Sequence, residues 1–164
     1  MALLQDARSF YTIPMIRILV VDEHEQVRRA LEACLRATED LQVVKSTGRY
    51  AQAVRDACTL APEVILLETK APDGIETLQA LRTAVPQAAV IVLTSYSDSR
   101  EEEAVLELGA VAYVLKTLDT HILLETIRQT AGDVLTESGS EVCEPFCSVV
   151  LQESESIHTN AAKT

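Results

Sequence analysis

The sequence predicts an α/β domain built on a doubly wound, five-stranded parallel sheet over residues 15–132. Five short aliphatic runs alternate along the chain with segments in which apolar residues recur every three or four positions. Such alternation is typical of successive β-α units. The runs are continuously apolar, as expected of strands that a parallel sheet buries on both faces. Because crossovers between parallel strands are right-handed, the helices should cover both faces of the sheet.

The first two predicted β-α units lie within residues 17–60. The run RILVV at 17–21 has the length and composition of a buried strand, and the apolar spacing that follows predicts an amphipathic helix over 25–37. A second aliphatic run at 41–44 predicts a strand, and residues 50–60 predict a second helix.

Three further units continue the alternation. A turn containing Pro72, Asp73 and Gly74 separates the third strand from its helix. Gly109 is placed to end the fourth helix in the left-handed conformation. The remaining strands and helices are predicted, in chain order, at 64–67, 75–84, 89–93, 99–108, 111–115 and 119–131.

The segments outside these units are predicted to be an N-terminal extension, 1–14, and an acidic flexible tail, 133–164, which is rich in Ser and Thr. No apolar run approaches the ~18 residues needed to cross a bilayer, so no membrane association is expected. We expect a cytoplasmic protein whose four cysteines form no disulfides.

The charge balance limits the partners of this chain. It carries 14 Lys and Arg against 25 Asp and Glu, a net charge of −11. Binding to nucleic acid needs clustered cations that neutralise phosphates, so no direct contact with nucleic acid is expected.

Polar residues stand where the predicted strands end. Because the carboxyl ends of parallel strands meet at one edge of the sheet, these side chains are expected to converge. Three carboxylates together favour a cation, and oxygen ligands suit Mg²⁺. An ammonium and a hydroxyl opposite the metal could stabilise a phosphoryl group. The predicted metal ligands are Asp22, Glu23 and Glu68, and the other two site residues are Thr94 and Lys116.

Four motifs carry a family resemblance: ILVVDEH, LLE followed by PDG, VLT and GAVAYVLK. They resemble the receiver domain of two-component response regulators, which has a flavodoxin-like fold. The segments DEHEQVRRAL and GAVAYVLK most resemble receivers that precede a LuxR-type helix-turn-helix DNA-binding domain. Residues 133–164 are too few and too acidic to be expected to form such a domain. The resemblance implies that Asp22 and Glu23 bind metal, that Thr94 and Tyr113 form the switch, and that Lys116 faces phosphate.

The sequence departs from the family at the phosphoacceptor, where Glu68 replaces an aspartate. The extra methylene moves the carboxylate by ~1.5 Å, and a misplacement of about 1 Å can lower a rate by on the order of a hundredfold. The resemblance then implies either a pseudo-receiver that works without phosphate or a carboxylate that partly mimics a phosphoryl group. Lys70 is expected to extend toward the site and to compete with the metal for its oxygens.

The sequence therefore predicts a non-enzymatic signalling module that regulates transcription indirectly. Its expected partners are a sensor histidine kinase or another regulator protein, with homodimerisation as a further option. Two alternatives stay open: a conventional receiver that a histidine kinase phosphorylates weakly, and a small Mg²⁺-dependent phosphotransferase or hydrolase that uses Asp22 as nucleophile. Against the phosphotransferase or hydrolase, the sequence contains no Gly-rich phosphate-binding loop. His24, Arg28 and residues 101–103 are expected to face solvent.

Overall fold

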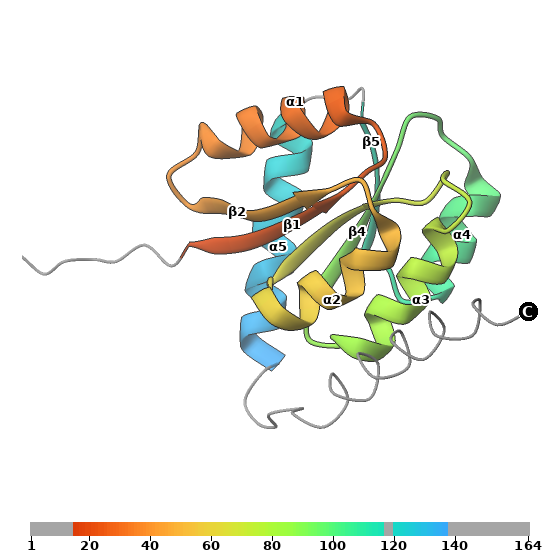
Figure 1. The fold of residues 1–164 in the computed structure, drawn as a ribbon. Coiled ribbons are helices and arrows are strands. Elements are labelled where there is room, and N and C mark those ends of the chain that lie inside the picture. The colour runs from red at the N-terminus through yellow and green to blue at the C-terminus, as the bar shows by residue number, and fades with distance from the viewer. Residues whose placement is uncertain (1–14, 117–119, 138–164) are drawn as a thin grey trace, which may run out of the picture.

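The computed structural model describes residues 15–116 and 120–137. Five strands form one parallel sheet in the order β2-β1-β3-β4-β5 (Figure 1). This strand order is that of the flavodoxin-like doubly wound fold, which confirms the predicted fold class. The strands are β1 (Ile16–Val21), β2 (Leu41–Thr47), β3 (Val64–Glu68), β4 (Ala89–Thr94) and β5 (Ala112–Leu115).

Five helices cover the two faces of the sheet (Figure 1). Helices α1 and α5 pack on one face, and α2, α3 and α4 pack on the other. Side chains alternate along β1, so this strand contributes to the hydrophobic core on both faces of the sheet. Leu19 and Val21 belong to the core under α2–α4, whereas Ile18 belongs to the core under α1 and α5. The helices are α1 (Glu25–Arg36), α2 (Tyr50–Leu60), α3 (Gly74–Ala84), α4 (Ser99–Glu107) and α5 (Thr120–Glu137).

Some element boundaries differ from those predicted. Strand β2 continues to Thr47, beyond the predicted end at 44, because an edge strand can carry polar residues on its open side while its backbone pairs with β1. Helix α5 continues to Glu137, beyond the predicted end at 131. Gly109 has φ 94°, which confirms the predicted left-handed cap.

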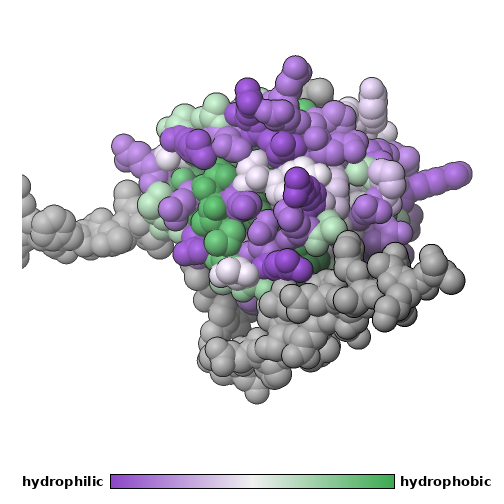
Figure 2. All heavy atoms as spheres, in the orientation of Figure 1, coloured by the Kyte–Doolittle hydropathy of each residue, from purple (hydrophilic) through white to green (hydrophobic). Residues whose placement is uncertain are grey.

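Hydrophilic side chains cover most of the face seen in Figure 2, and a hydrophobic strip lies on the side where β2 forms the sheet edge. Within the described residues, none of the helices is both long enough and apolar enough to span a membrane. Cys34 in α1 is a free thiol. Cys58 in α2 is disulfide-bonded, which corrects the expectation that no cysteine forms a disulfide. The predicted extension 1–14 and residues 138–164 of the predicted tail lie outside the described residues.

Candidate functional site

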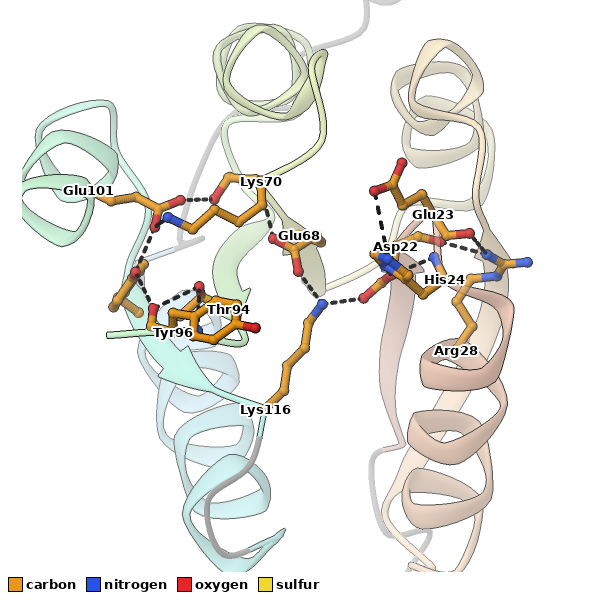
Figure 3. A network of polar contacts seen from close by, with 12 residues as sticks. Asp22, Glu23, His24, Arg28, Glu68, Lys70, Thr94, Tyr96, Glu101 and Lys116 are labelled. Carbon is orange, nitrogen blue, oxygen red and sulfur yellow. Dashed lines mark hydrogen bonds and ion pairs between the residues drawn. The ribbon is translucent and has the colours of Figure 1, made fainter. Parts of the chain in front are cut away.

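Two buried carboxylates and one ammonium meet at the carboxyl edge of the sheet (Figure 3). Asp22 follows β1, Glu68 ends β3 and Lys116 follows β5. The Nζ of Lys116 lies 2.6 Å from Oδ2 of Asp22 and forms a second ion pair with Oε2 of Glu68. Asp22 is 1% exposed and Glu68 is 3% exposed. The strand ends therefore converge as the sequence predicted, with the lysine between the two acids.

Each oxygen of these two carboxylates has a donor from the protein. Oδ1 of Asp22 accepts a hydrogen bond from the backbone N–H of His24, at 2.8 Å. Oε1 of Glu68 accepts one from the backbone N–H of Lys70, also at 2.8 Å. The Lys116 ammonium donates to the second oxygen of each carboxylate. Buried carboxylates are stable only when they are paired and hydrogen-bonded, and both conditions are met here by the chain itself.

The loop after β1 is held by an arginine that the sequence analysis placed in solvent. Nη1 of Arg28 donates to the backbone carbonyl oxygens of Asp22, at 2.6 Å, and Glu23, at 3.1 Å. A Cβ atom on Gly48 would lie 2.7 Å from this nitrogen, so the glycine leaves the guanidinium its space. The side chain of His24 is 62% exposed, but its Nδ1 lies 3.2 Å from Oδ1 of Asp22.

The structure does not group the three predicted metal ligands into a metal site. Among residues 15–116 and 120–137, no three His, Cys, Asp or Glu side chains are placed to hold an ion together. The Glu23 side chain is 49% exposed, and its Oε1 lies 3.9 Å from Nε2 of His24. The Lys116 ammonium stands between Asp22 and Glu68, whose oxygens are already engaged. In this arrangement the residues do not fit a Mg²⁺ ion, because the positive charge is supplied internally.

This arrangement predicts how the protein responds to Mg²⁺. A ligand that binds only the folded state raises the melting temperature, so excess Mg²⁺ is expected to leave the Tm of the wild-type protein unchanged. It should raise the Tm of Lys116→Gln, in which the buried ammonium is lost. Thermal unfolding in Mg²⁺ and in a chelator measures the Tm of the wild type and of Lys116→Gln. Lys70→Gln, which removes the same charge elsewhere, is the control. A rise in the wild-type Tm would show that the site accepts the ion as it stands.

Tyr50 is a site neighbour that sequence reasoning missed. It begins α2 and is 7% exposed. Its burial raises the pKa of the phenol, and the negative charges of Asp22 and Glu68 raise it further. A cleft of about 450 Å³, lined by the loops after β1, β2 and β3, opens beside it. Only the packing of α2 against the sheet brings this phenol near the acids, so no sequence motif could reveal it.

The two predicted switch residues lie on neighbouring strands: Thr94 ends β4, and Tyr113 lies in β5. Thr94 is fully buried, and its hydroxyl donates to the backbone carbonyl of Tyr96 at 3.0 Å. The hydroxyl of Tyr113 lies 3.2 Å from the same carbonyl oxygen and donates to Oε2 of Glu101 at 2.7 Å. Both hydroxyls are thus engaged within the β4–α4–β5 region.

Lys70 does not make the predicted contact with the site carboxylates. Its Nζ lies 2.5 Å from Oε2 of Glu101 in α4 (Figure 3). The prediction was wrong because the Lys70 side chain leaves the β3–α3 loop toward α4, whereas its backbone faces Glu68. The Lys70 ammonium therefore does not compete with a metal for the oxygens of Asp22 and Glu68.

Glu101 is not the solvent-facing residue that the sequence analysis expected. Its side chain is 12% exposed and accepts hydrogen bonds from Thr69, at 2.9 Å, and from Tyr113, in addition to its ion pair with Lys70. Burial acts to raise the pKa of Glu101, but the three donors outweigh it and hold the pKa below its usual value. The sequence signal was misleading because Glu102 and Glu103 beside it are exposed.

The strand order of the sheet, with buried charged groups at its carboxyl edge, places the domain in the flavodoxin-like class of α/β folds. The chain belongs to the response regulator receiver domain family, whose model matches residues 18–128. It is therefore a receiver domain of two-component signalling. Receiver domains of this family are typically not enzymes, generally bind Mg²⁺ at their phosphorylation site and interact with sensor histidine kinases.

Two curated relatives are similar over most of this chain. The transcriptional regulatory protein LiaR of Bacillus subtilis is 37% identical over 127 residues, which cover 76% of this chain and 60% of LiaR. The response regulator protein VraR of Staphylococcus aureus is 30% identical over 132 residues, which cover 79% of this chain and 60% of VraR. The match thus spans less than two thirds of each relative.

Solved structures show the same fold. The response regulator domain of Thermotoga maritima CheB has a TM-score of 0.67 and 29% identity, and the match covers 72% of this chain and 97% of that one. A LuxR-family DNA-binding response regulator from Staphylococcus aureus has a TM-score of 0.66 and 22% identity, with 71% and 99% covered.

Proposed function

We propose that this receiver domain is a pseudo-receiver, which transmits its state through protein–protein contacts without phosphorylation. The observation that carries the proposal is the state of Glu68, the residue at the phosphoacceptor position. Its two carboxylate oxygens accept from the Lys70 backbone and from Lys116, and the residue is 3% exposed. A nucleophile in this position would have to give up its ion pair before it attacked a phosphoryl donor.

The position of the carboxylate also argues against phosphoryl transfer. The side chain of Glu68 is one methylene longer than an aspartate, so its oxygens lie beyond the point from which an aspartate would attack. Loss of alignment by about 1 Å can cost on the order of a hundredfold in rate. A glutamate carries one negative charge, against roughly two for a phosphoryl group. Its carboxylate can therefore reproduce only part of the effect of phosphorylation on Lys116.

The partners follow from the family. A sensor histidine kinase or another regulator protein is the proposed partner, and a second copy of the chain is the alternative. The similar protein LiaR is a transcriptional regulatory protein, which supports a role in regulating transcription. With a net charge of −11, we propose that this role runs through another protein, because phosphate contacts require clustered cations.

A conventional receiver that is phosphorylated weakly is the second candidate, because Asp22, Thr94 and Lys116 are all present at the strand ends. The third candidate, a hydrolase with Asp22 as nucleophile, is less well supported. Asp22 is 1% exposed, and both of its oxygens accept hydrogen bonds.

Intact mass after incubation with Mg²⁺ and acetyl phosphate separates these candidates. Wild-type protein is expected to gain no phosphoryl mass, whereas Glu68→Asp is expected to gain one phosphoryl group. The advantage of the variant should be on the order of a hundredfold in rate. Glu102→Asp, which removes a methylene from an exposed residue of α4, is the matched control and should behave as wild type. Phosphorylation of the wild-type protein at Glu68 would refute the pseudo-receiver, and phosphorylation at Asp22 would favour the third candidate.

A further inference from the structure

We propose that Glu101 is a positioning residue that couples the Glu68 site to the α4–β5 surface through Lys70 and Tyr113. The inference rests on the proposed phosphate-independent function, because it names the path by which such a receiver would report the state of its site. The four residues come from β3, the β3–α3 loop, α4 and β5, and the contacts between them are continuous.

The first step joins the site to the loop. Lys70 uses its backbone N–H to hold Oε1 of Glu68, at 2.8 Å, and its ammonium to hold Oε2 of Glu101, at 2.5 Å. One residue thus contacts the site on one side and α4 on the other. A movement of the Glu68 carboxylate removes the acceptor of the Lys70 backbone, so it acts on the loop segment that carries the ammonium.

The second step joins the loop to α4. Glu101 receives donors from two consecutive loop residues, because the Thr69 hydroxyl binds Oε1 at 2.9 Å while Lys70 binds Oε2. The Lys70 side chain is 42% exposed, and an exposed ion pair alone contributes little. The two hydroxyl donors and the low exposure of Glu101 make the group a network, in which hydrogen bonds strengthen one another. The pKa of Lys70 is raised, chiefly by its bond to Glu101.

The third step joins α4 to β5. Tyr113 donates to the same Oε2 atom of Glu101 that Lys70 contacts, so the phenol and the ammonium share one acceptor. Burial raises the pKa of this phenol, and its bond to Glu101 raises it further. Loss of Lys70 from this acceptor changes the partner of Tyr113 directly. Thr94 also borders this phenol, because its hydroxyl donates to the Tyr96 carbonyl oxygen that Tyr113 contacts. The proposed path runs instead through Lys70 and Glu101, so the two routes to Tyr113 need separate variants.

The coupling is tested on the full chain by NMR of tyrosine labelled with ¹³C in the ring, of which the chain has four. Tyr113→Phe identifies the Tyr113 resonance. Glu68→Gln is expected to shift this resonance in the wild-type background, and the shift should be lost in the Glu101→Gln and Lys70→Met backgrounds. It should persist in Glu102→Gln, the control with the same charge change on the exposed side of α4, and in Thr94→Ala.

Glu68→Asp serves as a second probe of the same site. An equal shift of Tyr113 in the presence and absence of Glu101 would overturn the proposal, as would the absence of a shift with both Glu68 variants. Loss of the shift in Thr94→Ala alone would assign the coupling to the threonine and would also overturn it. The mass experiment measures phosphorylation, whereas this experiment measures coupling, so the failure of one is distinguishable from the failure of the other.

Discussion

Replacing Lys116 with methionine is expected to lower the free energy of unfolding by about 3–5 kcal/mol. Asp22 and Glu68 are 1% and 3% exposed, and Lys116 is the cation that contacts both. Its removal leaves two buried carboxylates without a counterion, and that penalty exceeds what the loss of one hydrogen bond would cost. Urea denaturation, followed by circular dichroism, measures the change.

A matched control and a double variant make this prediction specific. Lys70→Met also removes an ammonium from an ion pair, but the Lys70 side chain is 42% exposed, so the expected loss is only about 0–1 kcal/mol. Adding Glu68→Gln to Lys116→Met removes one of the two unpaired buried carboxylates. The double variant should therefore recover part of the free energy of unfolding that Lys116→Met loses. If the two substitutions in this pair were simply additive, the acid–ammonium cluster would not be an energetic unit.

Gly74→Ala is expected to lower the free energy of unfolding by about 1–3 kcal/mol. Gly74 begins α3, and a Cβ atom there would lie 2.5 Å from both the Cα and the carbonyl oxygen of Thr69. These are backbone atoms directly after Glu68, so they cannot turn aside as a flexible side chain would. The substitution must push apart the start of α3 and the loop that carries Thr69 and Lys70.

Gly132→Ala is the control for this substitution, with the opposite sign. Gly132 lies within α5, and a Cβ atom there would have no neighbour within 4 Å. Alanine in a helix is favoured over glycine by roughly 0.5–1 kcal/mol, so this variant should be slightly more stable than wild type. Urea denaturation of both variants compares the same chemical change in a crowded and an open place. Equal changes in the free energy of unfolding at the two positions would mean that the close contact with Thr69 does not cause the destabilisation expected of Gly74→Ala.

In the proposed function, the site keeps an acid, a threonine and a lysine of a receiver but holds an internal ion pair in place of phosphorylation. Asp22, Thr94 and Lys116 lie at strand ends, as the family resemblance led us to expect, and the Lys116 ammonium is engaged by two acids. Glu68 and Asp22 contact the same ammonium from the ends of neighbouring strands. In the proposed function, the domain therefore holds one site arrangement without an external ion or phosphoryl group.

The convergence of Asp22, Glu68 and Lys116 could be predicted from the sequence because it depends only on strand order and strand ends. In a parallel sheet, the residue after each strand lies at the same edge, whatever the details of packing. The contacts of Glu101, Lys70 and Arg28 could not be predicted in this way. They depend on how far α4 is rotated, on where a loop side chain turns and on the gap left by Gly48.

The sequence by itself determined the fold class, the order of the elements and the cap at Gly109, because periodicity and glycine conformation are local properties. It also placed a glutamate at the end of β3, the position that the family resemblance assigns to the phosphoacceptor. Only the tertiary structure decided that Lys116 stands between the acids and that Glu101 joins the β3–α3 loop to β5. These contacts link residues that are far apart along the chain, and their geometry is set by the packing of helices on the sheet.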